Sequence, residues 1–498
     1  MSKRIQLRVA RTRTPALLLT LAIGLLGGNS AFAEEPAAQP KAIDKAASTL
    51  QSLNELDGKA PARRTLNIQS WNTAEGARVL FVEAHELPMF DLRVLFAAGS
   101  SQDGTAPGIA LVTNAMLNEG VKGKNVSAIA EGFEGLGADF SNGSYRDMAL
   151  VSLRSLSATD KRDPALKLFS AVVGKPTFPA DSLARIKNQL LAGFEYQKQN
   201  PGKLASDELF KRLYGDHPYA HPSMGTAKSI TPITLAQLKA FHAKAYASGN
   251  AVIALVGDLS RTEAETIAAQ VSAALPKGPA LAKTIAPTEP KPGETHIEFP
   301  SKQTHLMLAE LGIDRADPDY AALSLGNSIL GGGGFGSRLM TEVREKRGLT
   351  YGVSSSFTPM QAQGPFMIGL QTRAELSENT LKLVKDITRD FLANGPTQKE
   401  LDDAKRELAG SFPLSTASNS AIAGQLGAIG FYNLPLTFLD DFMAQSQNVT
   451  VEQIKSAMNK HLDADKLVIV TAGPTVPQKP LPAPTDKPAE QPLGVPEH

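Results

Sequence analysis

An internal repeat constrains the fold of this chain more than any other feature of its sequence. Segment 234–246 and the apolar run 251–257 align without a gap with segment 450–462 and run 467–473, because Thr450 lies 216 residues after Thr234. In both copies a threonine precedes apolar residues at helical spacing, and the following apolar run ends in glycine. Segments 187–194 and 405–412 repeat at an offset of 218 residues. The two similar offsets predict a duplicated domain; the alternative is chance similarity between amphipathic helices.

The composition is that of a globular protein with a sizeable core. Hydrophobic residues make up 42% and charged residues 20% of the 498 residues, a length that suits two or more domains. Stretches 92–98 and 305–311 have the pattern of strands, and 320–330 and 401–408 that of helices. Strands and helices do not alternate strictly, which favours α+β over a doubly wound parallel sheet. We therefore expect two tandem domains, each a mostly antiparallel sheet with helices packed on one face.

Shifts in composition predict where these domains begin and end. A Pro/Lys/Thr-rich stretch separates the two copies, and proline-rich or Ala/Pro-rich stretches flank them. The expected order is a signal peptide at 1–33, a mobile segment at 34–62, an N-terminal domain at 63–275, a linker at 276–295, a C-terminal domain at 296–474 and a disordered tail at 475–498.

The first 33 residues have the order of a secretory signal. Five basic residues precede the apolar run 17–26, and Ala31-Phe32-Ala33 is a small-x-small cleavage site. The alternative is a retained membrane anchor, although the apolar run is shorter than the ~20 residues that a spanning helix needs. We expect cleavage near Ala33 and a periplasmic protein without stable membrane insertion.

Charge and cysteine content exclude several classes of function. The formal net charge is +1, so no overall positive field favours nucleic acid. The chain has no cysteine, which excludes disulfides, thiolate zinc sites and cysteine nucleophiles.

Segment 107–120 carries the first specific resemblance. It follows a strand-like stretch that ends at Ser100 and resembles the zinc helix of the pitrilysin/insulinase family of peptidases. Segment 129–140, which comes after it, resembles that family's next helix and strand. That family's signature is His-x-x-Glu-His, in which two histidines one helical turn apart hold Zn²⁺ and the glutamate activates water. The matching positions here are Leu111, Asn114 and Ala115. The third family ligand would fall near Glu195. We expect no metal at these degenerate positions.

The remaining histidines offer no replacement site. None of the eight forms His-x-x-Glu-His. His217 and His221 have i, i+4 spacing, but Pro218 and Pro222 oppose a helix, so we expect hydrogen-bonded or solvated loop histidines. His85 lies between two strand-like stretches and is interpreted as part of a hairpin turn. The chain also lacks a Gly-x-Ser-x-Gly nucleophile elbow.

Segment 330–355 carries the second specific resemblance, to the C-terminal half of the same family. It contains a run of four glycines followed by a phenylalanine: Gly331, Gly332, Gly333, Gly334 and Phe335. The run lacks the Gly-Lys-Ser/Thr ending of a phosphate loop, and it follows a helix-like stretch. In the family a glycine-rich loop leads into a helix, and an Arg and a Tyr seven residues apart face the zinc site of the other half.

Here that pair would be Arg344 and Tyr351. The resemblance implies that they bind the substrate carbonyl and stabilise the oxyanion, and that the glycine run and Phe335 contact substrate. The alternative is that Arg338, Arg344 and Arg347 are solvated helix charges and that Tyr351 begins a buried strand.

The two motifs together imply two pitrilysin-like domains without a zinc site of their own. The resemblance implies the non-zinc subunit of an insulinase-like metallopeptidase: this chain binds no cofactor, and a zinc-bearing partner subunit completes the site for hydrolysis of unfolded peptides. The alternative is a catalytically inert scaffold or peptide-binding protein of the same fold. A lone metallopeptidase with an unorthodox site is the third hypothesis.

Overall fold

The structure, a computed structural model, describes residues 65–485. These residues belong to one compact unit. The predicted signal peptide 1–33, the predicted mobile segment 34–62 and residues 486–498 lie outside the described residues.

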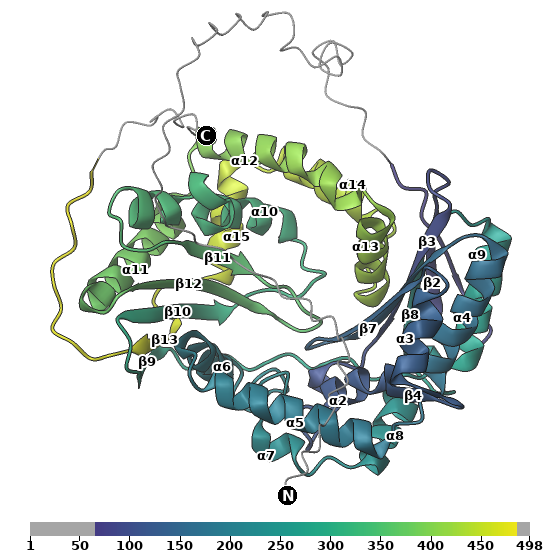
Figure 1. Ribbon diagram of the computed structural model, residues 1–498. Coiled ribbons are helices and arrows are strands. Elements are labelled where there is room, and N and C mark those ends of the chain that lie inside the picture. The colour runs from purple at the N-terminus through teal and green to yellow at the C-terminus, as the bar shows by residue number, and fades with distance from the viewer. Residues whose placement is uncertain (1–64, 486–498) are drawn as a thin grey trace, which may run out of the picture. The chain divides into compact units, whose positions relative to one another are not determined.

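Two large sheets organise the described chain (Figure 1). The first has the strand order β1-β2-β8-β3-β7-β6, and the second has the order β11-β12-β10-β13-β9. The strands of the first sheet are β1 (Gln69–Asn72), β2 (Arg78–Glu83), β3 (Met89–Phe96), β6 (Asp139–Ser144), β7 (Ala149–Leu156) and β8 (Ala251–Gly257). Those of the second are β9 (Gly293–Glu298), β10 (Gln303–Leu311), β11 (Val353–Phe357), β12 (Pro365–Arg373) and β13 (Val468–Gly473). A small hairpin joins β4 (Gly120–Val121) and β5 (Lys124–Asn125).

The two sheets share one topology, which confirms the predicted duplication. Strands β2-β8-β3-β7-β6 correspond in order to β9-β13-β10-β12-β11. In each sheet a single pair is parallel, β2 with β8 and β9 with β13, and the other pairs are antiparallel. The α+β assignment and the mostly antiparallel sheets are therefore confirmed.

Helices connect the strands in both halves. In the first half they are α2 (Ile109–Ala115), α3 (Val126–Glu134), α4 (Thr159–Gly174), α5 (Ala180–Gln197), α6 (Pro201–Tyr214), α7 (Ala227–Ile230), α8 (Leu235–Ala245) and α9 (Arg261–Ala274). In the second half they are α10 (Tyr320–Asn327), α11 (Ser377–Asn394), α12 (Gln398–Ser411), α13 (Asn419–Phe431), α14 (Phe438–Asn448) and α15 (Val451–His461). None of the helices within residues 65–485 is long and apolar enough to cross a membrane.

The repeated segment folds in the same way in both copies. Thr234 starts α8 and Thr450 starts α15, and each threonine forms a capping box with the glutamine three residues later. This reciprocal pair of hydrogen bonds satisfies two backbone donors at the helix start. The apolar runs that follow become β8 and β13, the buried strands that pair in parallel with β2 and β9.

Each sheet is covered on one face by helices of its own half, as predicted. In the first sheet Val79 and Phe81 pack in one core with α4 and α9, and in the second Leu306 and Leu308 pack with α10, α11 and α15.

The opposite face of each sheet is covered by a helix of the other half, which the sequence did not predict. Helix α13 packs on β2, β3 and β8, while α6 packs on β10 and β13 (Figure 1). On α13, Gly424, Gly427 and Gly430 face the sheet, and a Cβ at Gly430 would lie 2.4 Å from a Val252 methyl carbon. The three-residue glycine spacing therefore allows the helix to approach the strands closely.

Two local predictions are wrong. His85 does not form a hairpin turn, because β8 lies between β2 and β3; its ring nitrogens contact Asp258 and Glu83 at 2.7 and 2.8 Å. Nor is the described part of the predicted tail disordered. The Lys479 amide donates to the Glu375 carbonyl at 2.7 Å, and Leu481 packs on the second core.

The segment that joins the halves is held on both sides. The Ile285 carbonyl contacts His217 Nε2 at 2.8 Å, and the Thr284 amide donates to Gln361 Oε1 at 2.9 Å. Strand β9 begins at Gly293, inside the predicted linker range 276–295.

Candidate functional site

Helix α2 carries the positions of the degenerate zinc motif, and a buried aspartate fixes where it begins. Both carboxylate oxygens of Asp103 accept backbone hydrogen bonds, from the Gly108 amide at 2.6 Å and the Ala110 amide at 2.9 Å. Gly108 has φ +96, and a Cβ there would lie 2.4 Å from the Ile230 side chain, so glycine is required. Burial raises the pKa of Asp103 to about 7.

The three degenerate positions on α2 cannot hold zinc. Leu111 and Ala115 carry no donor atom. Asn114 is buried, and its amide nitrogen donates to the Tyr246 hydroxyl at 3.2 Å and to the Leu150 carbonyl at 3.4 Å. An amide cannot act as a general base, so the donor set fits neither the metal nor the water chemistry of the family motif.

Tyr246 is the residue of this region that sequence reasoning missed. It is fully buried on the segment after α8, stacks with His242 at 5.1 Å between ring centroids, and burial raises its pKa. The residue at the equivalent position of the second copy is Leu462. A comparison of the two copies could therefore have singled out Tyr246, because the first copy has a hydroxyl where the second has an apolar side chain, and Asn114 bonds to that hydroxyl. Glu195, the weak third-ligand candidate, is exposed and pairs with Lys198 at 2.7 Å.

The other histidines behave as structural side chains. Both ring nitrogens of His217 are engaged, Nδ1 by the Tyr219 amide and Nε2 by Ile285, and His221 Nδ1 contacts the Pro222 carbonyl. Among residues 65–485 one group could offer three metal ligands, Asp317, Asp319 and His461. Asp319 Oδ2 contacts His461 Nε2 at 3.0 Å and also Lys460 Nζ at 2.6 Å, so ion pairing explains why these side chains lie together.

The glycine run is packed against its own half rather than forming an open loop. It lies in a π-helical turn, Ser328–Gly332, and the short turn Gly334–Gly336. A Cβ at Gly331 would lie 2.6 Å from Ser355 Oγ, one at Gly332 2.4 Å from Asn327 Nδ2, and one at Gly333 2.7 Å from the Ser328 carbonyl oxygen. Gly334 has open space but φ +64. These close approaches explain the need for glycine at Gly331, Gly332 and Gly333. Gly331 is buried and Gly332 and Gly334 are exposed, and contact of the glycine run with substrate stays a prediction.

Phe335, Arg344 and Tyr351 form one surface cluster. The Arg344 guanidinium lies 4.5 Å from the Phe335 ring centroid and 5.4 Å from that of Tyr351. Phe335 is 63% exposed and Tyr351 87% exposed, so Tyr351 does not begin a buried strand; β11 starts two residues later. Arg344 lies in a second π-helical turn, Met340–Glu345, and such turns are frequent at functional sites.

Arg344 differs from its neighbours in having no hydrogen-bonded partner for its guanidinium among residues 65–485. Arg338 donates to both carboxylate oxygens of Glu400, at 2.7 and 2.9 Å, and Arg347 pairs with Glu342 at 2.8 Å. The five donors of Arg344 and the Tyr351 hydroxyl are therefore available to an external acceptor such as a peptide carbonyl. No hydrogen bond, ion pair or ring contact joins this cluster to Leu111, Asn114 or Ala115 in the described chain.

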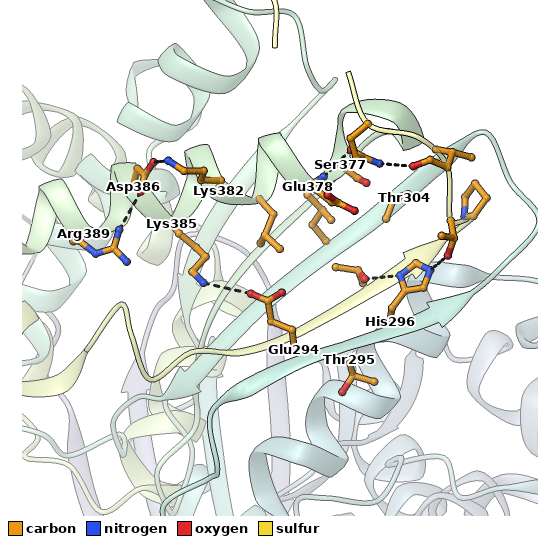
Figure 2. A pocket seen from close by; sticks show the side chains of 17 residues that line it. Glu294, Thr295, His296, Thr304, Ser377, Glu378, Lys382, Lys385, Asp386 and Arg389 are labelled. Atoms are coloured by element: carbon orange, nitrogen blue, oxygen red, sulfur yellow. Dashed lines mark hydrogen bonds and ion pairs between the residues drawn. The ribbon is translucent and has the colours of Figure 1, made fainter. Parts of the chain in front are cut away.

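A cavity of about 650 Å³ lies elsewhere, between β9 and α11 (Figure 2). Five of its charged side chains are paired with each other: Lys385 reaches Glu294 at 3.3 Å, and Lys382 and Arg389 both reach Asp386, at 2.7 and 3.0 Å. The cavity does not include the Arg344 cluster.

The repeat explains this cavity. In the first half α9 packs over Val79 and Phe81 of β2. The corresponding positions on β9 are the polar Glu294 and His296, and β13 is followed by an extended segment instead of a helix. The cavity is thus the solvated counterpart of a helix site and is not a candidate for catalysis.

Comparisons with known proteins agree with these observations. The sequence profile described as "Insulinase (Peptidase family M16)" matches residues 78–227, and the profile "Peptidase M16 inactive domain" matches residues 232–408. Among curated proteins, a "Non-peptidase homolog YmxG" of Helicobacter pylori is 29% identical over 78% of this chain and 90% of its own length. An uncharacterized zinc protease of Mycobacterium bovis is 25% identical over 85% of this chain and 95% of its own.

Solved structures show the same relationship. The crystal structure of a peptidase M16 inactive domain from Pseudomonas fluorescens is 80% identical, with a TM-score of 0.82 over 83% of this chain and all of that one. A protease from Helicobacter pylori has the same fold, with a TM-score of 0.76 over 82% of this chain and all of that one at 19% identity.

Proposed function

The chain belongs to peptidase family M16 as a degenerate, pitrilysin-like member, and from this premise we propose that it is the non-zinc subunit of a periplasmic two-chain metallopeptidase. Its own α2 cannot hold zinc, so the partner is a family member with an intact His-x-x-Glu-His helix. The substrate class is unfolded peptide.

The observation that carries the proposal is the uncommitted guanidinium of Arg344. Every neighbouring arginine of segment 338–347 is used in an intramolecular ion pair, whereas Arg344 lies between two exposed aromatic rings. The rings restrict the guanidinium without occupying its donors, because a cation–π contact engages the face of the planar group. A side chain held in this way is prepared to bind an anion or a carbonyl oxygen.

Arg344 and Tyr351 would act on the carbonyl of the peptide bond that is cleaved. Their N–H and O–H donors bind the carbonyl oxygen and stabilise the negative charge that develops there during attack by water. Donors placed in advance at that oxygen contribute to the rate because they need no reorganisation as charge appears. Phe335 would pack against an apolar part of the same peptide.

Export to the periplasm is part of the proposal. It is supported by the basic N-terminal residues, the short apolar run 17–26 and the Ala31-Phe32-Ala33 cleavage site. The absence of cysteine is compatible with an oxidising compartment, because no thiol can form a wrong disulfide there. Osmotic-shock fractionation with an antibody to the chain tests it directly.

The enzymatic test uses the purified complex with the zinc-bearing family member of the same genome. Replacement of Arg344 by Met keeps the aliphatic stem and removes the donors, and should lower kcat by about 10²-fold or more. Tyr351→Phe removes one hydroxyl and should lower kcat by about 10-fold or more. Assembly, measured by size-exclusion chromatography, should not change.

Matched controls separate catalysis from general damage. Arg373→Met and Tyr196→Phe alter an exposed arginine and an exposed tyrosine outside the cluster, and should leave turnover unchanged. Unchanged turnover of both cluster variants would remove these residues from the mechanism.

A second candidate is an inert scaffold or peptide-binding protein of the same fold. Two observations favour it. Asn114 is hydrogen-bonded to Tyr246 inside the protein, and the Helicobacter pylori relative is named a non-peptidase homolog. It predicts that neither Arg344→Met nor Tyr351→Phe affects any peptidase activity, whereas the two-chain peptidase predicts loss in both.

A further inference from the structure

The last described residues of the chain lie beside the turn that carries Arg344. After β13, residues 474–485 form neither helix nor strand (Figure 1). The side-chain amide of Gln478 holds this stretch by hydrogen bonds to residues at and just before the start of α11. At its end the Thr485 amide donates to the Lys346 carbonyl at 2.9 Å. The stretch is therefore fixed at both points and delivers the chain to Lys346.

The residues that follow are tethered close to the Arg344 cluster, which consists of Phe335, Arg344 and Tyr351. Lys346 is two residues after Arg344, and consecutive Cα atoms are about 3.8 Å apart, so these two Cα atoms lie within ~7.6 Å of each other. Segment 486–498 lies outside the described residues, and an extended chain of that length spans up to about 45 Å. The segment is therefore long enough to cover a cluster that begins beside its tether.

The charge of segment 486–498 is complementary to that of the cluster. The segment carries three carboxylates and one amine: Asp486, Glu490, Glu497 and Lys487. On the other side, Arg338 and Arg347 are engaged by Glu400 and Glu342, whereas the guanidinium of Arg344 contacts only the two aromatic rings within residues 65–485. Hydrogen bonds between a guanidinium and a carboxylate are charge-assisted and stronger than neutral ones.

The apolar residues of the segment suit the two exposed rings. Its prolines recur every four residues, and two aliphatic residues lie between the last pair: Pro488, Pro492, Pro496, Leu493 and Val495. Proline-rich sequences favour an extended backbone before binding, so they dock on exposed aromatic side chains with little further loss of conformational entropy. Phe335 and Tyr351 are such side chains, 63% and 87% exposed in the described chain.

We propose that segment 486–498 binds the Arg344 cluster of its own chain, with its carboxylates on Arg344 and its proline and aliphatic side chains on Phe335 and Tyr351. A short tether gives an effective concentration of about 1 mM, so an intrinsic Kd of about 0.5 mM leaves the cluster about two-thirds occupied. The segment then competes with peptide for the cluster. This regulatory consequence rests on the proposed function, whereas the contact itself does not.

The reactivity of Arg344 toward phenylglyoxal, which modifies free guanidinium groups, measures the contact in the purified full chain without partner or substrate. Modified arginines are identified by peptide mass mapping. The neutralised variant, Asp486→Asn/Glu490→Gln/Glu497→Gln, removes the carboxylates and keeps the segment. Arg344 should react about threefold faster in this variant than in the unaltered chain, because occupancy of about two-thirds leaves a third of the guanidinium free.

Two controls separate the contact from a general effect of charge. Arg373, exposed in the second sheet, is the internal reference and should react at the same rate in both proteins. The variant Glu131→Gln/Glu134→Gln/Asp139→Asn removes as many negative charges from exposed positions of the first half, and Arg344 should stay as protected as in the unaltered chain.

Peptide added in trans identifies the occupant. A peptide of residues 486–498, at about 10 mM, should restore the protection of Arg344 in the neutralised variant. The same peptide with its three carboxylates replaced by amides should not. Equal reactivity of Arg344 in the unaltered chain and the neutralised variant would overturn the contact, as would equal protection by the two peptides.

The regulatory consequence is measured in the complex with the zinc-bearing family member. The neutralised variant should lower KM about threefold at unchanged kcat, because the fraction of free cluster rises from about a third to near one. An unchanged KM would overturn the regulatory role. The outcome is distinct from failure of the proposed function, which is decided by the turnover of Arg344→Met, because protection of Arg344 is measured without catalysis.

Discussion

Replacement of Gly331 by alanine tests whether the glycine run serves the packing of the chain itself. The new Cβ would lie 2.6 Å from Ser355 Oγ, 2.7 Å from a Leu339 methyl carbon and 2.8 Å from the Ser355 backbone nitrogen. Each separation is well below the ~3.5–4.0 Å of an ordinary contact. The backbone nitrogen belongs to strand β11 and cannot rotate away, so the strand or the π-helical turn must shift.

The magnitude follows from two effects. An extra methyl group in a tightly packed interior costs about 1–3 kcal/mol. The Ser355 hydroxyl donates to Asn327 Oδ1 at 2.8 Å, and its displacement would cost about 0.5–1.5 kcal/mol more. We therefore expect Gly331→Ala to lower the free energy of unfolding by about 2–4 kcal/mol.

Two other glycines of the same run are matched controls. Gly336 has no atom within 4 Å of the position that a Cβ would occupy and no positive φ, so Gly336→Ala should change stability by less than about 0.5 kcal/mol. Gly334 also has open space but a φ of +64, and alanine there should cost about 1–2 kcal/mol. Urea unfolding, with the shift in midpoint multiplied by a common m-value, measures all three. Equal midpoints for Gly331→Ala and Gly336→Ala would refute the packing argument.

Three further predictions concern other parts of the structure. Burial raises the pKa of Glu310 to about 7, so the contribution of this side chain to stability is fully present below the unfolded pKa of about 4.5 and is lost as pH rises through 7. The variant Glu310→Gln should therefore have the same free energy of unfolding as the parent at pH 4. At pH 8 its free energy of unfolding should be higher than that of the parent by up to about 3 kcal/mol, measured by urea unfolding at both pH values. Tyr246→Phe removes the hydroxyl that the buried Asn114 amide uses and should cost about 1–3 kcal/mol, measured in the same way; a neutral result would mean that water replaces the hydroxyl. Deletion of residues 475–498 removes the Lys479 hydrogen bond and the Leu481 packing, and should lower the thermal midpoint more than deletion of 486–498; equal midpoints would show that segment 475–485 adds nothing to stability.

The duplicated fold could be predicted because local and repeated signals agree. Thr234 and Thr450 begin equivalent helices, and each is followed by a buried strand that ends in glycine, so one rule describes both copies. The assignment of the family's zinc positions to Leu111 and Ala115 stays a prediction, and it rests on side chains that have no metal-binding atom.

The exchange of α6 and α13 between the halves could not be predicted from the sequence. An amphipathic pattern says that a helix buries one face but not which sheet it meets. The glycine spacing at Gly424, Gly427 and Gly430 indicates close approach, yet the strands approached lie more than 150 residues earlier in the chain. The hairpin assigned to His85 was wrong for a related reason: β8, which separates β2 from β3, comes from residues 251–257.

The roles within segment 330–355 were only partly readable. The sequence brought Gly331 to Gly334, Phe335, Arg344 and Tyr351 into one motif, but the packing of the first three glycines depends on Asn327, Ser328 and Ser355, which lie on both sides of the run. The separation of Arg344 from the paired Arg338 and Arg347 likewise required the positions of Glu400 and Glu342.

The most direct test of the two-chain account is the zinc content of the purified mature chain together with its cleavage of a quenched, unstructured peptide. Both are measured for the chain alone and after mixing with the zinc-bearing family member of the same genome. The account predicts no bound zinc and no cleavage by the chain alone, and cleavage in the mixture above that of the zinc-bearing member by itself. Stoichiometric zinc and chelator-sensitive cleavage by this chain alone would contradict it.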